Sequence, residues 1–257
     1  MWPATNQQKH FVLIHGACHG AWCWYKLETL LTSAGHKVTS LDLAASGINP
    51  KQVQDLNSIT DYFEPLMEFM ASLSQDEQVI LVGHSHNGLS ISVAMERFPQ
   101  NISVAVFISA IMPSPTNSVV AIQEEYERLA KDSSMQRKYW FDVLPSLDQL
   151  SRQYQKSPPE DLTLATKLVR PMGFYGIEDM AKETAVTEEK YGSVSRVFVL
   201  CDEDILLKAF LKLMIKLSPP DEVKEIPGSD HMVMMSKPQE LCAYLLDVAD
   251  RYSLIPI

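Results

Sequence analysis

Short apolar runs alternate with amphipathic stretches along most of this chain. Runs of strand length lie at 10–15, 37–43, 79–82, 104–110, 194–200 and 223–226. Apolar positions recur at helical spacing at 22–34, 59–73, 88–97 and 238–253. Pro65 interrupts the periodicity of the second helical stretch. Strands that alternate with helices predict an α/β fold, built on a mostly parallel sheet with helices on its faces.

The pattern changes between residues 113 and 182, where we find no convincing strand. Helices are expected at 119–131, 136–141, 147–155 and 160–168. We predict a core of residues 1–112 and 183–257, with 113–182 inserted as a helical cap. The aromatic residues of this cap suit an apolar pocket roof, although for each one a role in attaching the cap to the core is the commoner role. They are Tyr126, Tyr139, Trp140, Phe141, Phe174 and Tyr175.

The sequence Gly-His-Ser-His-Asn at 83–87 carries the strongest chemical signal. It follows a short apolar run and precedes a helical stretch, which places Ser85 at the apex of a tight turn. This layout is a nucleophile elbow, in which the serine hydroxyl is exposed at the end of the sheet. A serine at a helix start would explain Ser85 in isolation, and Asn87 stands where a second glycine is usual. The interpretation therefore depends on residues elsewhere in the chain.

An acid and a base lie downstream of Ser85 in the order that an α/β-hydrolase requires. Asp204 follows the strand expected at 194–200, and His231 follows the one at 223–226. A serine hydroxyl becomes a good nucleophile only when a base takes its proton, and a buried carboxylate fixes the imidazole for that step. Asp202 and Glu203 compete with Asp204, because three acids at a strand end are often only a solvated turn.

The small residues after the first expected strand can supply an oxyanion hole. The backbone N–H of Ala17 is the first candidate donor, and the N–H of His86, directly after the nucleophile, is the second. The residues that we place in the substrate pocket are Gly16, His19, Trp140, Phe141 and Met232.

Composition and charge narrow the classes of partner. The net charge of −10 disfavours nucleic acid and anionic membrane surfaces. No apolar run approaches the roughly 20 residues that span a bilayer, and the N-terminus lacks the apolar core of a signal peptide. The four cysteines have no paired spacing, which favours a reduced cytoplasmic protein. Several histidines crowd the expected site, but no carboxylates or thiolates accompany them at ligand spacing, so we expect no metal.

Three longer motifs make the chain resemble a known family. They lie at 10–22 (HFVLIHGACHGAW), 41–47 (LDLAASG) and 228–232 (GSDHM). They are similar to those of the plant methylesterase and hydroxynitrile lyase family of α/β-hydrolases, and the likeness covers nearly the whole chain. The resemblance implies an α/β-hydrolase fold with a helical cap inserted after the sixth strand. It also implies a cytoplasmic enzyme that needs no cofactor and is often a homodimer.

Individual residues favour the esterase branch of this family. Its hydroxynitrile lyases carry threonine, glutamate and lysine where this chain has Gly16, His84 and Met232. Met232 cannot supply the positive charge that departing cyanide needs. The resemblance therefore implies a serine carboxylesterase that hydrolyses the methyl ester of a small plant metabolite. The stretches 44–50 and 102–107 most resemble those of a family member that cleaves an indole alkaloid ester. This closer resemblance implies such a substrate, and a product acid with a β-carbonyl group would then lose carbon dioxide.

Other functions stay open at this point. The same pocket could serve a lyase or cyclase that uses His231 for proton transfer, or a methylesterase of a hormone ester such as methyl salicylate or methyl jasmonate. A receptor without catalysis is disfavoured, because it would need no set of Ser85, Asp204 and His231. His86 and Asn87 depart from the family pattern, and we expect them to tune substrate choice rather than to supply the base.

Overall fold

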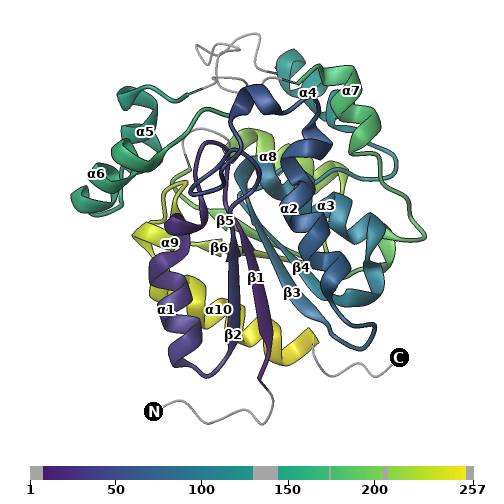
Figure 1. The fold of residues 1–257 in the computed structure, drawn as a ribbon, viewed down its shortest axis with the longest axis horizontal. Coiled ribbons are helices and arrows are strands. Elements are labelled where there is room, and N and C mark those ends of the chain that lie inside the picture. Colours follow the sequence, from purple (N-terminus) through teal and green to yellow (C-terminus); the bar gives the residue numbers. More distant parts are fainter. Residues whose placement is uncertain (1–7, 130–143, 174, 205–207, 253–257) are drawn as a thin grey trace.

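The computed structural model describes residues 8–129, 144–173, 175–204 and 208–252. Within these ranges six strands form one parallel sheet in the order β2-β1-β3-β4-β5-β6 (Figure 1). Their bounds are β1 His10–Ile14, β2 Lys37–Leu41, β3 Val79–His84, β4 Ile102–Ile108, β5 Arg196–Cys201 and β6 Glu222–Ile226. The prediction of an α/β fold on a parallel sheet is confirmed.

The strand order places a switch point between β1 and β3. The chain moves from β1 to β2 on one side, and then crosses to β3 on the other side of β1. In open α/β sheets, ligands bind beyond the carboxyl ends of the strands at such a point. The expected oxyanion loop follows β1 and Ser85 follows β3, so the topology brings these two segments together.

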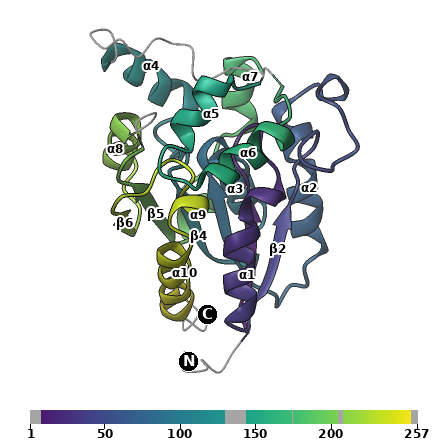
Figure 2. The same cartoon turned by 90° about the vertical axis from the view of Figure 1, so that its left-hand side faces the viewer.

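Helices cover both faces of the sheet (Figures 1 and 2). On one face lie α1 (Tyr25–Ser33), α9 (Val233–Ser236) and α10 (Pro238–Tyr252), whose apolar side chains share one core cluster. On the other face lie α2 (Ile59–Ser72), α3 (Gly88–Arg97) and α8 (Lys208–Leu217), in a second cluster. Successive residues of β1 alternate between the clusters, so this strand is buried on both sides, as a central parallel strand requires.

The helices of the predicted cap lie above the carboxyl ends of the strands (Figure 1). They are α4 (Val119–Leu129), α5 (Leu147–Gln153), α6 (Pro159–Leu168) and α7 (Ile177–Glu183). Apolar residues of α4 and α7 join the core cluster of α2, α3 and α8, whereas those of α5 and α6 join the cluster of α1 and α10. The expected helix at 136–141 lies outside the described residues. So do Tyr139, Trp140, Phe141 and Phe174.

The position of the cap corrects one expectation. Among the described strands, four precede α4, and the cap follows β4 rather than a sixth strand. The reason is the number of crossovers, since only α1, α2 and α3 connect strands before the cap, and β5 and β6 come after it.

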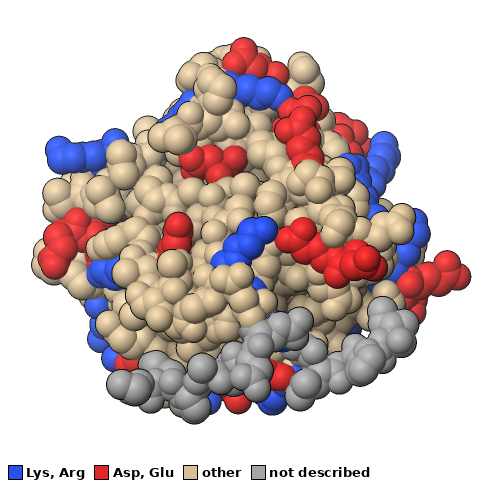
Figure 3. Space-filling model, turned by 60° about the horizontal axis from the view of Figure 1, so that its bottom comes forward, with Lys and Arg blue, Asp and Glu red and all other residues tan. Residues whose placement is uncertain are grey.

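The surface away from the cap carries charges of both signs. Seen from below, acidic and basic side chains lie interspersed in small groups (Figure 3). In the part of the chain that the structure describes, no helix is both long and apolar enough to cross a membrane.

Candidate active site

Ser85 stands at a strained turn between β3 and α3. Its backbone φ is 55°, in the left-handed region that a serine rarely adopts. A Cβ at Gly83 would come 2.9 Å from Ile91, and one at Gly88 would come 1.9 Å from the carbonyl oxygen of Ile111. These glycines let the strand and helix meet closely, and the amide of Ile111 donates to the carbonyl of Ser85 at 2.9 Å. The turn thus has the geometry of a nucleophile elbow.

His231 connects Ser85 to a buried carboxylate. Its Nε2 lies 3.0 Å from Ser85 Oγ, and its Nδ1 lies 2.7 Å from Asp204 Oδ2. Because Nδ1–H donates to the carboxylate, Nε2 presents its lone pair to the serine hydroxyl. Burial favours the neutral ring, but the charge and hydrogen bond of Asp204, with the charge of Asp230, hold the pKa of His231 above its usual value. This arrangement can take the serine proton.

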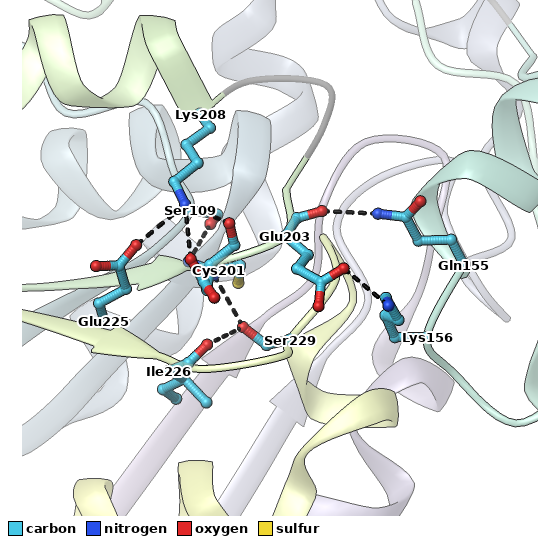
Figure 4. A network of polar contacts seen from close by, with 10 residues as sticks. Ser109, Gln155, Lys156, Cys201, Glu203, Lys208, Glu225, Ile226 and Ser229 are labelled. Carbon is cyan, nitrogen blue, oxygen red and sulfur yellow. Dashed lines mark hydrogen bonds and ion pairs between the residues drawn. The ribbon is translucent and has the colours of Figure 1, made fainter.

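The two competing acids face other partners. Asp202 pairs with Lys208 at 2.7 Å. Glu203 pairs with Lys156 at 2.8 Å (Figure 4). Both carboxylates are about 40% exposed, whereas Asp204 is 1% exposed. Of the three acids, the structure therefore brings Asp204 to the imidazole.

His15 fixes the loop after β1. Nδ1–H of His15 donates to the Gly16 carbonyl at 2.8 Å, and its Nε2 accepts from the amide of Leu43 at 3.1 Å. Since the peptide is trans, holding the Gly16 carbonyl on one side orients the N–H of Ala17 to the other. A Cβ on Gly16 would lie 3.1 Å from Ser85 Cβ, so this loop lies against the nucleophile. The geometry suits the expected oxyanion role of Ala17, which stays a prediction.

His19 has both ring nitrogens engaged within the protein. Nδ1 bonds the Ala17 carbonyl at 2.8 Å, Nε2 bonds the Tyr154 hydroxyl at 2.8 Å, and the ring stacks with those of Trp22 and Tyr154. Burial lowers the pKa of His19 to about 4, so the ring is neutral at physiological pH. Its place in the pocket stays a prediction. The hydrogen bonds of its ring join the oxyanion loop to the cap.

The other proposed pocket residues differ in their surroundings. Gly16 contacts the nucleophile, as described above. Met232 is fully buried in the core cluster of α1 and α10, and its amide donates to Asp230 at 3.0 Å. Trp140 and Phe141 belong to the stretch that the structure does not describe.

The two unusual residues of the elbow lie in different environments. Asn87 is fully buried, and its Nδ2 donates to the His15 carbonyl and, at 3.2 Å, to the Tyr62 hydroxyl. It therefore ties the elbow to the oxyanion loop. The ring of His86 is partly exposed, and among the described residues its Nδ1 has no hydrogen-bond partner. Burial lowers the pKa of His86 to about 4, so this ring is also neutral at physiological pH.

Sequence reasoning gave no role to two residues beside the base. His84 donates through Nε2 to the carbonyl of His231 at 2.8 Å, with the rings 4.7 Å apart. Asp230 is fully buried and precedes His231. His84 directly precedes Ser85, and Asp230 directly precedes His231. This adjacency to the expected nucleophile and base was the signal in the sequence that could have indicated a role for them.

The crowded histidines do not converge on a common point. Within the described ranges, no three histidine, cysteine or acidic side chains lie close enough to hold a metal ion. His15 and His19 each use both ring nitrogens in hydrogen bonds within the protein, and His84 uses its Nε2.

Comparison with known proteins finds relatives over nearly the whole chain. Residues 11–244 match the alpha/beta hydrolase family. The chain is 55% identical to methyl jasmonate esterase 1 of Vitis vinifera, over 96% of this chain and 99% of the relative. It is 44% identical to polyneuridine aldehyde esterase of Rauvolfia serpentina, over 96% and 97%. The crystal structure of tomato methylketone synthase I with 2-tridecanone superposes with a TM-score of 0.87, at 49% identity, over 96% of this chain and 100% of that one.

Proposed function

Because the chain belongs to the alpha/beta hydrolase family, in its group of plant methylesterases, we propose that it hydrolyses the methyl ester of a small metabolite with Ser85 as nucleophile. The observation that carries the proposal is the hydrogen-bonded series Asp204, His231 and Ser85, with distances of 2.7 Å and 3.0 Å. The strained elbow and the adjoining oxyanion loop support the same chemistry.

The proposed reaction has two halves. His231 Nε2 takes the proton of Ser85 while Oγ attacks the ester carbonyl carbon, and the N–H groups of Ala17 and His86 bind the developing oxyanion. The protonated His231 then gives its proton to the departing methoxide, so that methanol leaves and an acyl-enzyme remains. Water deprotonated by His231 attacks that acyl group, and the proton returns to Ser85 as the carboxylic acid is released.

The favoured substrate changes once the relatives are known. The sequence favoured an indole alkaloid ester, but identity is 55% to a methyl jasmonate esterase and 44% to polyneuridine aldehyde esterase. We therefore place methyl jasmonate first among the esters to test, an indole alkaloid methyl ester second and methyl salicylate third. One screen by mass spectrometry ranks them by kcat/KM.

A second candidate is the removal of carbon dioxide from a β-keto acid. It is favoured by the 48% identity to tomato methylketone synthase I, whose structure was determined with β-ketoheptanoate bound to an H243A variant. The intact set of Ser85, Asp204 and His231 weighs against it as the main reaction, since decarboxylation needs no serine nucleophile. Supplying the free β-keto acid to a Ser85→Ala variant separates the two, because only the decarboxylase would keep its activity.

The main test is covalent labelling. An organophosphonate should add one adduct to the intact mass, on Ser85, and Ser85→Ala should lose activity by about 10³-fold or more. An active preparation that takes no adduct on Ser85 would contradict the mechanism. We also propose that the enzyme works in the cytoplasm, without a cofactor, as a homodimer, and light scattering tests the last point.

A further inference from the structure

The residues Tyr154, Gln155, Lys156 and Ser157 connect α5 to α6 in the cap. This segment 154–157 contacts three loops that carry the proposed catalytic groups. They are the oxyanion loop at 15–20, the acid loop at 201–204 and the histidine loop at 228–232. No other role has been assigned to the segment, and each contact has a distinct chemistry.

The contact with the oxyanion loop passes through Tyr154. The neutral ring of His19 donates from Nδ1 to the Ala17 carbonyl, so Nε2 accepts from the Tyr154 hydroxyl at 2.8 Å. Tyr154 is 2% exposed and stacks on His19. The cap thereby holds the peptide next to the expected oxyanion donor.

The contact with the acid loop is made at Glu203, the neighbour of Asp204 (Figure 4). Gln155 Nε2 donates to the Glu203 carbonyl at 2.7 Å, and Lys156 Nζ pairs with its carboxylate at 2.8 Å. The amide of Glu203 donates to the carbonyl of Ser229 at 2.8 Å. The acid loop is thus held by the cap on one side and by the histidine loop on the other.

The contact with the histidine loop is a buried carboxylate. Asp230 Oδ2 accepts from the amide of Lys156 at 2.8 Å, and from the amide and hydroxyl of Ser157 at 2.8 Å and 2.9 Å. Its Oδ1 accepts from the amide of Met232 at 3.0 Å. A fully buried charge needs such donors, and bonds to a charged acceptor are stronger than neutral ones.

We propose that Asp230 is a positioning residue, which anchors segment 154–157 between the three loops and so sets their spacing around Ser85. The inference rests on the proposed function, because it takes His231 as the base. Small displacements of a catalytic group reduce rate far more than they reduce binding. Asp230 also acts on the base directly, because its negative charge raises the pKa of His231.

Few titratable groups face His231, which makes its pH dependence interpretable. They come from the acid loop, the elbow, the oxyanion loop and its own loop, and they are Asp204, His84, His19 and Asp230. Burial lowers the pKa values of His84 and His19, so the two carboxylates are the charges that matter near neutral pH.

The test compares Asp230→Asn with Asp161→Asn. Asp161 on α6 is also buried, but its carboxylate accepts from Tyr25 Oη at 2.8 Å and from Lys26, both on α1, so its hydrogen bonds hold the cap to α1. Both variants should lose several degrees of Tm. Only Asp230→Asn should lose kcat, by about tenfold or more with KM within about twofold. It should also move the acid limb of kcat/KM down by about 0.5 pH unit or more, since a lost negative charge lowers the pKa of His231.

Two further measurements keep the proposal falsifiable if Asp230→Asn does not fold. Tyr154→Phe keeps the stacked ring and removes one hydroxyl, and it should reduce kcat several-fold with little change in KM. Hydrogen exchange should show faster exchange of the Lys156 and Ser157 amides in Asp230→Asn than in Asp161→Asn. A folded Asp230→Asn with the kcat and pH profile of Asp161→Asn, or a Tyr154→Phe with unchanged kcat, would overturn the proposal.

Failure of the proposed function would look different. In that case the wild-type protein would hydrolyse no ester and take no phosphonate adduct on Ser85. The exchange measurement would still report whether Asp230 anchors the segment.

Discussion

Gly16 lies where any side chain would collide with His84. A Cβ there would come 2.7 Å from His84 Nδ1 and 3.1 Å from Ser85 Cβ. His84 is 1% exposed and holds the His231 carbonyl, so it cannot move aside freely. At this scale, the identity of one small residue determines whether the oxyanion loop, the elbow and the histidine loop can pack together.

We expect Gly16→Ala to destabilise the fold by about 1–3 kcal/mol and to reduce kcat/KM, because overpacking forces the elbow or His84 to shift. Adding His84→Ala makes room for the new methyl group. The double variant should therefore unfold at a higher urea concentration than the sum of the two single effects predicts. Strict additivity in urea unfolding would contradict the steric explanation.

Asp204 and Asp202 should respond very differently to the same change. Asp204→Asn should reduce kcat by about 10³–10⁴-fold, because an amide favours the wrong imidazole tautomer. Asp202→Asn should stay within about twofold, since its side chain pairs with Lys208 near the surface. Steady-state kinetics on one methyl ester compare them, and a reversed ranking would move the acid to Asp202.

The candidate site could be predicted from the sequence where the position of a residue along the chain determines its position in the fold. Ser85, Asp204 and His231 each follow a strand of one parallel sheet, so their side chains converge at its carboxyl edge. The direction of a side chain in a loop depends on packing that sequence does not display. For that reason the tie of Asn87 to the His15 carbonyl and the anchoring contacts of Asp230 emerged only from the structure.

Helices and strands were predicted well where the spacing of the apolar residues and the length of the run indicate the same type of element. The central strands matched because continuous apolar runs of this length have few other uses in such a fold. Helix α8 was not predicted, although its apolar face packs Phe210 and Met214 into the core. Pro65 lies inside α2 without ending it, because Ser58 and Asp61 cap the helix start and its apolar face stays buried.

Arg170 joins the end of α6 to the loop after β2. Its Nη1 donates to the carbonyls of Gly47 and Asn49 at 3.0 Å and 2.7 Å, and its Nη2 donates to the carbonyl of Lys51 at 2.8 Å. Its amide donates to the Cys18 carbonyl at 2.9 Å. The planar guanidinium reaches carbonyls that the single nitrogen of a lysine could not reach together.

Arg170→Met should therefore destabilise the protein by about 2–3 kcal/mol, and Arg170→Lys by about half as much. The control is Arg128→Met, since Arg128 is 63% exposed and pairs with Glu125 on its own helix. That change should cost less than about 0.5 kcal/mol. Urea unfolding measures all three, and equal midpoints for Arg170→Met and Arg128→Met would show that the hydrogen bonds of the Arg170 side chain contribute nothing to stability.

On the scale of the whole molecule, the histidines are mostly withdrawn from water. Of the 7 histidines, 6 have lowered pKa values with burial as the largest cause. The exception is His231, whose pKa the carboxylates raise. The folded protein therefore resists protonation at positions where the unfolded chain accepts it.

This difference predicts steep acid destabilisation. Below about pH 6.5 the unfolded chain binds more protons than the folded one, so the free energy of unfolding falls as pH falls towards the folded pKa values, which are about 4 for His19 and His86. His231 opposes this, because a raised folded pKa stabilises the fold below pH 6.5, but it is one group against six. Lowered carboxylate pKa values matter only below about pH 5. Urea unfolding should show a free energy of unfolding that falls between about pH 6.5 and pH 5.5, with His19 and His86 together contributing about 2 kcal/mol over that interval. His86→Leu should reduce the slope of the free energy of unfolding against pH by about 1 kcal/mol per pH unit. A wild-type free energy that does not change with pH, or an unchanged slope in His86→Leu, would mean that these rings already bind protons in the folded state.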